Sequence, residues 1–310
     1  MRPATAGDPI TGTKWTRKTT AKVSAELRKV GIAASPRTVA RILDDLDYRL
    51  RVNHKKLSRG SAQTRRQRNQ QFLHIEQTRR SFAQRGLPVI SVDTKKKELI
   101  GCFKNPGAVW ARAATPVNDH DFRSDADHIT SPYGVLDVAA NRGHVFVGTS
   151  HDTPAFAADC ITRWWKVEGR SRYPRADQML ILADNGGSNG SRPRAWKYNL
   201  ATKLCVPHEL TITVCHYPSG ASKWNPIEHQ LFSHISNNWA GEPLVTIETM
   251  LNFIRTTKTE TGLRVRATLM NGDYPKGIKP TPADMATLPI QFHDILSEWN
   301  YTIAPQENGK

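Results

Sequence analysis

Apolar positions follow a helical period near the amino terminus. Two stripes recur every three to four positions: Val23, Leu27 and Val30, then Val39, Leu43 and Leu46. Gly31 ends the first stripe, and Ser35 and Pro36 supply a helix cap and a first helical residue before the second. The pattern predicts two short helices joined by a tight turn, which is typical of a helix-turn-helix. A helical hairpin used only for packing is the structural alternative.

The pattern changes to strands after Pro88. Short apolar runs at 89–94, 99–100, 133–139, 144–149, 179–183 and 210–215 predict strands. Helices are expected to open at Thr153-Pro154 and at Asn225-Pro226, the latter with an apolar stripe of Leu231, Phe232, Ile235 and Trp239. The order of three strands, helix, strand, helix, strand, helix predicts an α/β protein with a ribonuclease-H-like mixed sheet flanked by helices.

Three acidic residues stand where these elements end or begin. Asp93 follows Val89-Ile90-Ser91-Val92, Asp184 follows an apolar run from Met179 to Ala183, and Glu228 lies in the first turn of the helix after Asn225. Carboxylates bind hard divalent cations, and a cluster of them at one point is what metal-dependent phosphoryl transfer requires. We therefore expect Asp93, Asp184 and Glu228 to be catalytic and to bind metal.

Each of these residues has a structural alternative. Asp93 could pair with a lysine of the run 95–97, because a buried charge needs a partner. Asp184 could shape the Gly-rich turn that follows it. Glu228 could serve with Asn225 as a helix-capping pair.

The positive charge lies mainly in the amino-terminal third. Residues 1–87 contain 20 Lys/Arg and 6 Asp/Glu, which accounts for +14 of the net charge of +16. A basic segment ahead of a nearly neutral body indicates a DNA-binding part joined to a catalytic domain, with a solvated basic surface as the alternative. Within the second predicted helix, Arg37, Thr38 and Arg41 are expected to contact DNA.

Four segments follow from these patterns. Residues 14–52 form the small all-α helix-turn-helix module, in which the alternation at 48–52 suits a wing-like strand; residues 53–87 form a basic helical connector, in which Lys55 and Lys56 are expected to contact DNA. Residues 88–262 form the catalytic domain, with residues 101–132 as an inserted loop or subdomain. Residues 263–310 form a C-terminal extension.

The four cysteines show no paired spacing, so neither a zinc site nor a disulfide framework is indicated. No apolar run reaches membrane-spanning length, and the amino terminus lacks the apolar stretch of a signal peptide. We expect a cytoplasmic, nucleoid-associated protein with no membrane partner.

Several motifs resemble one family. The stretches 91–98, 183–190 and 222–229, followed by 231–236, 261–267 and 298–303, are similar to the Rhodopirellula-type DDE transposases of bacterial insertion sequences. The resemblance covers roughly residues 14–303. Asn225-Pro226-Ile227-Glu228 also matches the motif around the last acidic residue of the broader mariner-like group.

The resemblance implies a DNA transposase. Asp93, Asp184 and Glu228 would hold two Mg²⁺ ions roughly 4 Å apart, with Mn²⁺ as a substitute, for cleavage at insertion-sequence ends and strand transfer into target DNA. Lys223 and Trp224 would hold a DNA end by phosphate contact and base stacking. The partners would be double-stranded DNA, as terminal inverted repeats and target, and further copies of the chain in a dimer or larger assembly.

Two alternatives stay open from the residues alone. One is a ribonuclease-H-like nuclease that cuts without joining. The other is a truncated, non-catalytic DNA-binding remnant, because relatives often carry additional amino-terminal DNA-binding sequence before the matched part.

Overall fold

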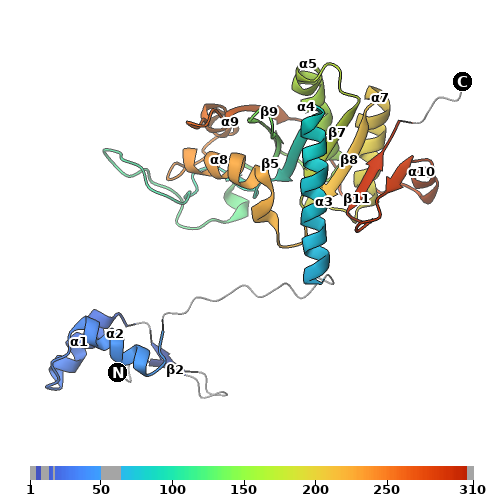
Figure 1. Cartoon of the computed structure of the whole chain (residues 1–310). Helices are drawn as coiled ribbons and strands as arrows, with labels where there is room; N and C mark the ends of the chain where they lie inside the picture. Colours follow the sequence, from blue (N-terminus) through green and yellow to red (C-terminus); the bar gives the residue numbers. More distant parts are fainter. Residues whose placement is uncertain (1–4, 8–13, 17, 50–63, 306–310) are drawn as a thin grey trace, which may run out of the picture. The chain divides into compact units, whose positions relative to one another are not determined.

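The computed structural model describes residues 5–7, 14–16, 18–49 and 64–305. The chain divides into two compact units, residues 1–57 and 58–310 (Figure 1). In the described part of the chain, no helix is both long and apolar enough to cross a membrane.

The amino-terminal unit contains the two predicted helices. These are α1 (Thr20–Lys29) and α2 (Pro36–Asp45). The Ser35 hydroxyl accepts the Thr38 N–H at 3.1 Å, so Ser35 caps α2 as the sequence predicted. Gly31 takes a left-handed φ of +82° between the helices, a conformation that glycine adopts without steric cost.

This unit is not described by helices alone. Strands β1 (Thr5–Gly7) and β2 (Lys14–Thr16) pair antiparallel, so the expected all-α module is not confirmed. Tyr48 and Arg49 are not in a strand, and the rest of the suggested wing lies outside the described residues.

The predicted apolar stripes of this unit are only partly buried. Val23 and Val39 are each 3% exposed, whereas Val30 is 71% and Leu46 62% exposed. The apolar spacing at the carboxyl ends of these helices therefore does not correspond to buried positions in this unit. Two ten-residue helices in contact cover only the side chains near their crossing.

The second unit, residues 58–310, is called the body. It contains a nine-stranded sheet. Its strands are β3 (Val89–Thr94), β4 (Glu98–Ile100), β5 (His128–Asp137), β6 (Arg142–Gly148), β7 (Gln178–Ala183), β8 (Thr211–His216), β9 (Arg264–Met270), β10 (Ile290–Phe292) and β11 (Asn300–Ile303). Their order is β10-β11-β8-β7-β3-β5-β6-β9, with β4 paired to β5 off this path.

Strand β3 is central. On one side it pairs antiparallel with β5, which pairs antiparallel with β6; on the other it runs parallel to β7, which runs parallel to β8. This arrangement, with the first core strand between an antiparallel meander and two parallel strands, confirms the predicted ribonuclease-H-like mixed sheet. The residues after 262 complete both edges, because β9 pairs parallel with β6 and β11 pairs antiparallel with β8.

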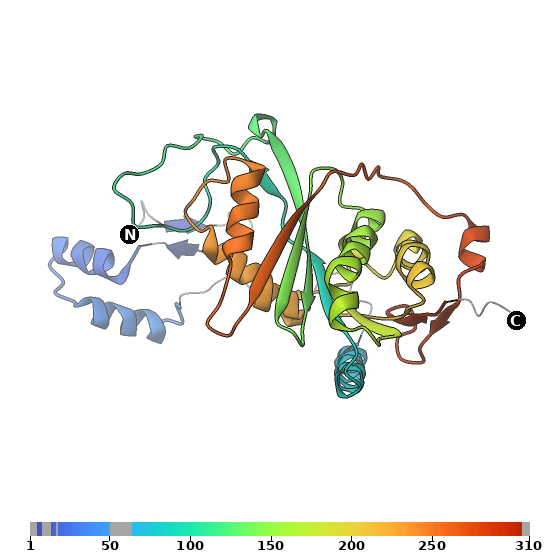
Figure 2. The same cartoon turned by 90° about the horizontal axis from the view of Figure 1, so that it is seen from above.

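Helices cover both faces of the sheet (Figures 1 and 2). The α-helices of the body are α3 (Arg65–Gln84), α4 (Pro154–Trp164), α5 (Arg170–Arg172), α6 (Arg194–Leu200), α7 (Val206–His208), α8 (Ser233–Asn238), α9 (Ile247–Thr256) and α10 (Pro282–Ala286). Short 3₁₀ turns are η2 (Arg123–Asp125), η4 (Gly187–Asn189) and η6 (Ser222–Trp224), and π-helical turns are η3 (Trp165–Gly169), η5 (Ala201–Cys205) and η7 (Glu228–Phe232).

Alternation along the strands separates the two faces. Ile90 and Val92 of β3 pack with α4 and α6 in one core cluster. Val89 packs with α3 in another, and Leu136 of β5 packs with η7, α8 and α9 in a third. The first face is therefore covered by α4 and α6, and the opposite face by α3, η7, α8 and α9.

Helix α3 lies within the predicted connector, yet it packs on the sheet. Ile75 and Phe82 are buried against β3 and β7, and Phe72 is partly buried. The buried Gln71 amide donates to His216 O at 2.9 Å and to Asn300 Oδ1 at 2.8 Å. The helix is thereby fixed to β8 and β11.

The segment between β4 and β5 is irregular apart from η2, as the long insertion predicted. Strand β5 begins at His128, so the irregular part is shorter than the predicted residues 101–132. Trp110 within it is fully exposed.

Candidate active site

Strand register brings two of the predicted carboxylates together. Val92 of β3 pairs with Ala183 of the parallel strand β7, so Asp93 and Asp184, one residue further along each strand, are neighbours. Adjacent strands lie about 4.8 Å apart, and residues level with each other on parallel strands point to the same face. Asp93 and Asp184 therefore share one face at the carboxyl ends of these strands.

A buried hydrogen-bonded group brings the third carboxylate to the same strand. The Ser91 hydroxyl donates to Asn225 Oδ1 at 2.5 Å, and the Ile227 N–H donates to Ser91 Oγ at 3.1 Å. Ser91 and Asn225 are both 0% exposed. Since Ser91 lies two residues before Asp93, these bonds fix the turn that carries Glu228 on the Asp93 face of β3. We call Ser91 and Asn225 the strand–helix clamp.

The clamp decides one of the alternatives left open by the sequence. An N-capping Asn225 would use its side chain on the helix, but its Oδ1 accepts from Ser91 and its Nδ2 donates to Val92 O at 3.4 Å. The capping-pair interpretation of Asn225 and Glu228 is therefore wrong. Glu228 instead begins the π-helical turn η7, which has no side-chain cap; such turns are frequent at functional sites.

The carboxylates raise one another's proton affinity. Burial, then the charges of Asp184 and Glu228, raise the pKa of Asp93 to about 8. Burial also raises the pKa of Asp184, and burial and the Asp184 charge raise that of Glu228. Lys95 does not relieve Asp93, because its ammonium pairs with Glu98 at 2.5 Å; among the described residues, Asp93 has no salt bridge to the lysine run.

One oxygen of this group has no protein partner. Asp184 Oδ2 accepts the Ser222 hydroxyl at 2.9 Å, whereas Asp184 Oδ1 is buried without a hydrogen bond. A buried acceptor left unpaired is costly, and a cation would satisfy it. Three carboxylates also form the donor set that hard divalent cations prefer.

The side chains do not form a complete metal cage as they stand. Within residues 18–49 and 64–305, no group of three or more His, Cys, Asp or Glu side chains is arranged so that it could hold an ion. The three carboxylates thus lie on one face, but their side chains as placed do not form a set of ligands around one point.

A fourth acidic residue, which the sequence analysis did not select, lies beside the site. The Thr94 hydroxyl donates to Asp152 Oδ1 at 3.2 Å and lies 3.4 Å from Ser188 Oγ. Asp152 contributes to the raised pKa of Asp93. Its only signal in the sequence is its place directly before the Thr153-Pro154 helix start, which indicates a cap as readily as a site.

An aromatic and basic surface adjoins Asp184 on the same face. The Lys223 ammonium lies 4.0 Å from the Trp224 ring centroid, and Trp224, which is 51% exposed, lies 5.6 Å from the Phe72 ring of α3. Arg68 of α3 donates to Ser219 O at 2.7 Å. The predicted DNA-contacting residues Lys223 and Trp224 therefore directly follow Ser222, the hydrogen-bond partner of Asp184.

The other predicted DNA contacts lie in the amino-terminal unit. Arg37 and Arg41 are exposed on α2, one helical turn apart. The Thr38 hydroxyl lies 2.8 Å from Ser35 Oγ and so takes part in the cap. Lys55 and Lys56 lie outside the described residues.

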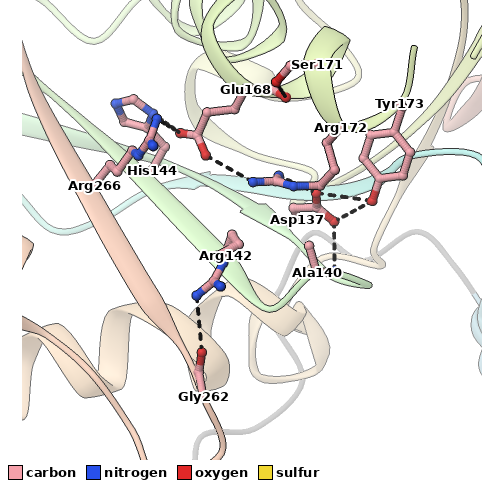
Figure 3. Close-up of polar contacts among 10 residues, drawn as sticks. All are labelled: Asp137, Ala140, Arg142, His144, Glu168, Ser171, Arg172, Tyr173, Gly262 and Arg266. Carbon is pink, nitrogen blue, oxygen red and sulfur yellow. Dashed lines mark hydrogen bonds and ion pairs between the residues drawn. The ribbon is translucent and has the colours of Figure 1, made fainter.

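A second polar network lies on β5, β6 and the turn η3 (Figure 3). His144 Nδ1 lies 2.6 Å from Glu168 Oε1, and Arg172 bonds both Asp137, at 2.7 Å, and Glu168, at 3.3 Å. Burial alone would raise the pKa of Glu168, but the His144 hydrogen bond and nearby charges lower it. Tyr173 also donates to Asp137. The charged groups of this network are paired with one another, which indicates a structural role for the network.

The four cysteines are free in the structure.

Comparison with known proteins gives one broad match. A family model described as Rhodopirellula transposase DDE domain matches residues 1–305. No curated protein sequence matches the chain.

Solved structures similar to the chain include several of Mos1 transposase. They include a paired-end complex with the left transposon end (16% identity, TM-score 0.47, covering 76% of this chain and 65% of that chain) and a strand transfer complex (16%, 0.47, 80% and 71%). A mariner Mos1 paired-end complex with Mg is similar at 15% identity and TM-score 0.45, covering 76% and 65%. The chain thus spans 65% of the length of the first of these structures. The family match is the finding that bears on function.

Proposed function

Because the chain belongs to the Rhodopirellula transposase DDE domain family, we propose that it cleaves DNA at the ends of a mobile element and joins those ends to target DNA. The observation that carries the proposal is the shared face of β3 and β7, where Asp93 and Asp184 are level with each other and the strand–helix clamp holds Glu228 close by.

In this proposal Asp93, Asp184 and Glu228 hold divalent metal, Mg²⁺ or Mn²⁺, as a pair of ions. When bound, the ions would supply Lewis acidity and would activate water, or later a 3′-hydroxyl, for attack on a phosphodiester. Ser222 orients Asp184 through Oδ2, which leaves Oδ1 available as a ligand.

The raised proton affinities support this role. Three carboxylates on one face repel each other when ionised, and bound cations remove that repulsion. The protein gains most from a cation where its own side chains leave the negative charge uncompensated, as at Asp93.

DNA is the proposed partner of both units. Lys223 contacts a phosphate and Trp224 stacks on a base beside the carboxylates, while Arg37 and Arg41 read the terminal inverted repeat from helix α2. A dimer or larger assembly of the chain would bring two element ends together.

The test is cleavage and strand transfer on a duplex carrying the DNA that flanks the gene. Asp93→Asn, Asp184→Asn and Glu228→Gln should each lower both activities in Mg²⁺ by at least about 10³-fold while DNA binding persists. Asp177→Asn removes an exposed carboxylate near β7 and is the matched control.

The alternatives give different results in the same assay. Cleavage without joined product would indicate a nuclease. Binding without any turnover by the unaltered chain would indicate a non-catalytic remnant, and full activity of Glu228→Gln would remove that residue from the site.

A further inference from the structure

A pocket opens at the same sheet edge as the carboxylates, toward the face covered by α4 and α6. It has a volume of about 560 Å³, and it is lined by the start of α4, by η4, by residues 192–195 at the start of α6 and by residues 277–280 after β9. All of these segments belong to the body.

The pocket is linked to Asp93 through one residue. Thr94 donates its backbone N–H to Asp93 Oδ1 at 2.8 Å, while its hydroxyl contacts Asp152 and Ser188, both of which line the pocket. Asp93 and Thr94 are consecutive strand residues and point to opposite faces. The pocket therefore lies across the end of β3 from the carboxylates.

The lining combines cationic and apolar side chains. Arg192, Arg194 and Lys279 are exposed, and none has an ion-pair partner within residues 64–305. One carboxylate, that of Asp152, lines the pocket, and it accepts the Thr94 hydroxyl. Ile278, which is 70% exposed, and three prolines form the apolar part.

The backbone is open to close approach at this pocket. Gly187 and Gly277 take left-handed φ angles of +66° and +84°, and a Cβ added at either would meet no atom within 4 Å. Glycine at such positions lets a ligand lie against the main chain.

We propose that this pocket binds one strand of DNA immediately beside the scissile phosphate, with its phosphates on Arg192, Arg194 and Lys279 and a sugar or base on Ile278. The proposal rests on the proposed function of the carboxylates. A pocket of this volume suits a ligand of small-molecule size, so it matches a nucleotide of a single strand and not a whole duplex. A nucleotide combines the anionic and apolar groups that the lining matches.

The two faces then have complementary roles. Lys223 and Trp224 hold DNA on the Asp184 side, and the pocket holds the strand that continues past the carboxylates. The strand crosses the end of β3, where Asp93 is placed.

The experiment compares two DNA ends with the full-length protein, without divalent metal. One duplex stops at the scissile phosphate, and the other continues beyond it as four unpaired nucleotides, tested on each strand in turn. Dissociation constants are measured between 50 and 200 mM NaCl. The variant is Arg192→Ala with Arg194→Ala, and the control is Arg170→Ala with Arg175→Ala, which removes the same charge from exposed positions outside this pocket.

The extension should steepen the salt dependence of binding by the unaltered protein. For a single strand, each phosphate contact adds about 0.7 to the slope of log affinity against log salt concentration. Losing two arginines should therefore lower the slope added by the extension by about 1.4. Between 50 and 200 mM NaCl, this corresponds to a difference of about sevenfold in how far salt weakens binding. The control should keep the whole increment.

An increment that is unchanged in the Arg192/Arg194 variant, or equally lost in the control, would overturn the proposal. The outcome does not depend on turnover, because no metal is present. Failure of cleavage in Mg²⁺ with the increment intact would reject the proposed function alone, and cleavage with no pocket-dependent increment would reject the pocket alone.

Discussion

Replacing Asp93 by asparagine should stabilise the metal-free protein at neutral pH, although it removes a residue proposed to be essential. The Asp93 carboxyl has a pKa of about 8 in the folded protein, against 3.8 for an ordinary aspartate. Asparagine keeps the shape and the acceptor for the Thr94 N–H without the charge. The expected gain in unfolding free energy is therefore the extra cost of ionising Asp93 in the folded protein compared with the unfolded protein.

The sign follows from proton binding. Below pH 4 both the folded and unfolded states hold the proton, so Asp93 has no effect on stability. Between pH 4 and 8 the unfolded state has lost the proton and the folded state keeps it, so stability falls as the pH rises. Four pKa units correspond to at most about 6 kcal/mol. Since neighbouring carboxylates share this repulsion and the side chains can relax, we expect about 2 kcal/mol at pH 8.

The assay is urea unfolding in the presence of a chelator between pH 4.5 and 8.5. The difference in unfolding free energy between Asp93→Asn and the unaltered protein should grow with pH and level off above 8. Asp177→Asn, at an exposed position, should show no such trend. Equal pH dependence of all three proteins would refute the reasoning.

Adding metal distinguishes an effect of the Asp93 charge from a stabilisation that is independent of Asp93. At a hundredfold excess over its dissociation constant, a bound ion adds about 2.7 kcal/mol to the stability of the protein that binds it. Mg²⁺ or Mn²⁺ should therefore stabilise the unaltered protein and have little effect on Asp93→Asn. Equal stabilisation of both by metal would place the ion elsewhere.

Three further predictions concern other parts of the chain. Asn225→Ala should cost about 1–3 kcal/mol, because it leaves the O–H donor of the buried Ser91 without an acceptor, and it should raise the Mg²⁺ concentration needed for cleavage. Adding Ser91→Ala should cost less than the sum of the two single changes, and strict additivity in a double-mutant cycle would argue against the clamp. Arg172→Met should lower stability by about 2 kcal/mol by leaving the buried Asp137 without its ion pair, and a melting temperature equal to that of the unaltered protein would contradict this. Arg37→Ala should weaken binding to the inverted repeat by about 1–3 kcal/mol relative to a scrambled duplex in gel-shift titrations; an equal loss on both would make it a phosphate contact.

The strands and the placement of two carboxylates could be predicted because their cause is local. An apolar run ending in an acidic residue shows where a buried strand reaches the sheet edge, so Asp93 and Asp184 stand out. The helix stripe that includes Leu231 and Ile235 likewise depends on spacing alone, and both residues are buried.

What could not be predicted depends on partners distant in the sequence. Asn225 precedes a proline at a helix start, which indicates a cap, and only the fold shows that its partner is Ser91 on β3. Asp152 gains its place through Thr94 in the same way. The residues after 262 also belong here, because the sequence of β9 or β11 does not show which strand it pairs with, and only the fold reveals β6 and β8 as their partners.

The site depends more strictly on the pairing register of β3 and β7 than on the number of residues between its carboxylates. A slip of one residue would send Asp93 and Asp184 to opposite faces of the sheet, whereas the 44 positions between Asp184 and Glu228 include loops that can change in length. Insertions should therefore be tolerated in the segment between β4 and β5 and in the loops between Asp184 and Glu228. A single-residue deletion inside β3 or β7 should separate the carboxylates even where the sheet still forms.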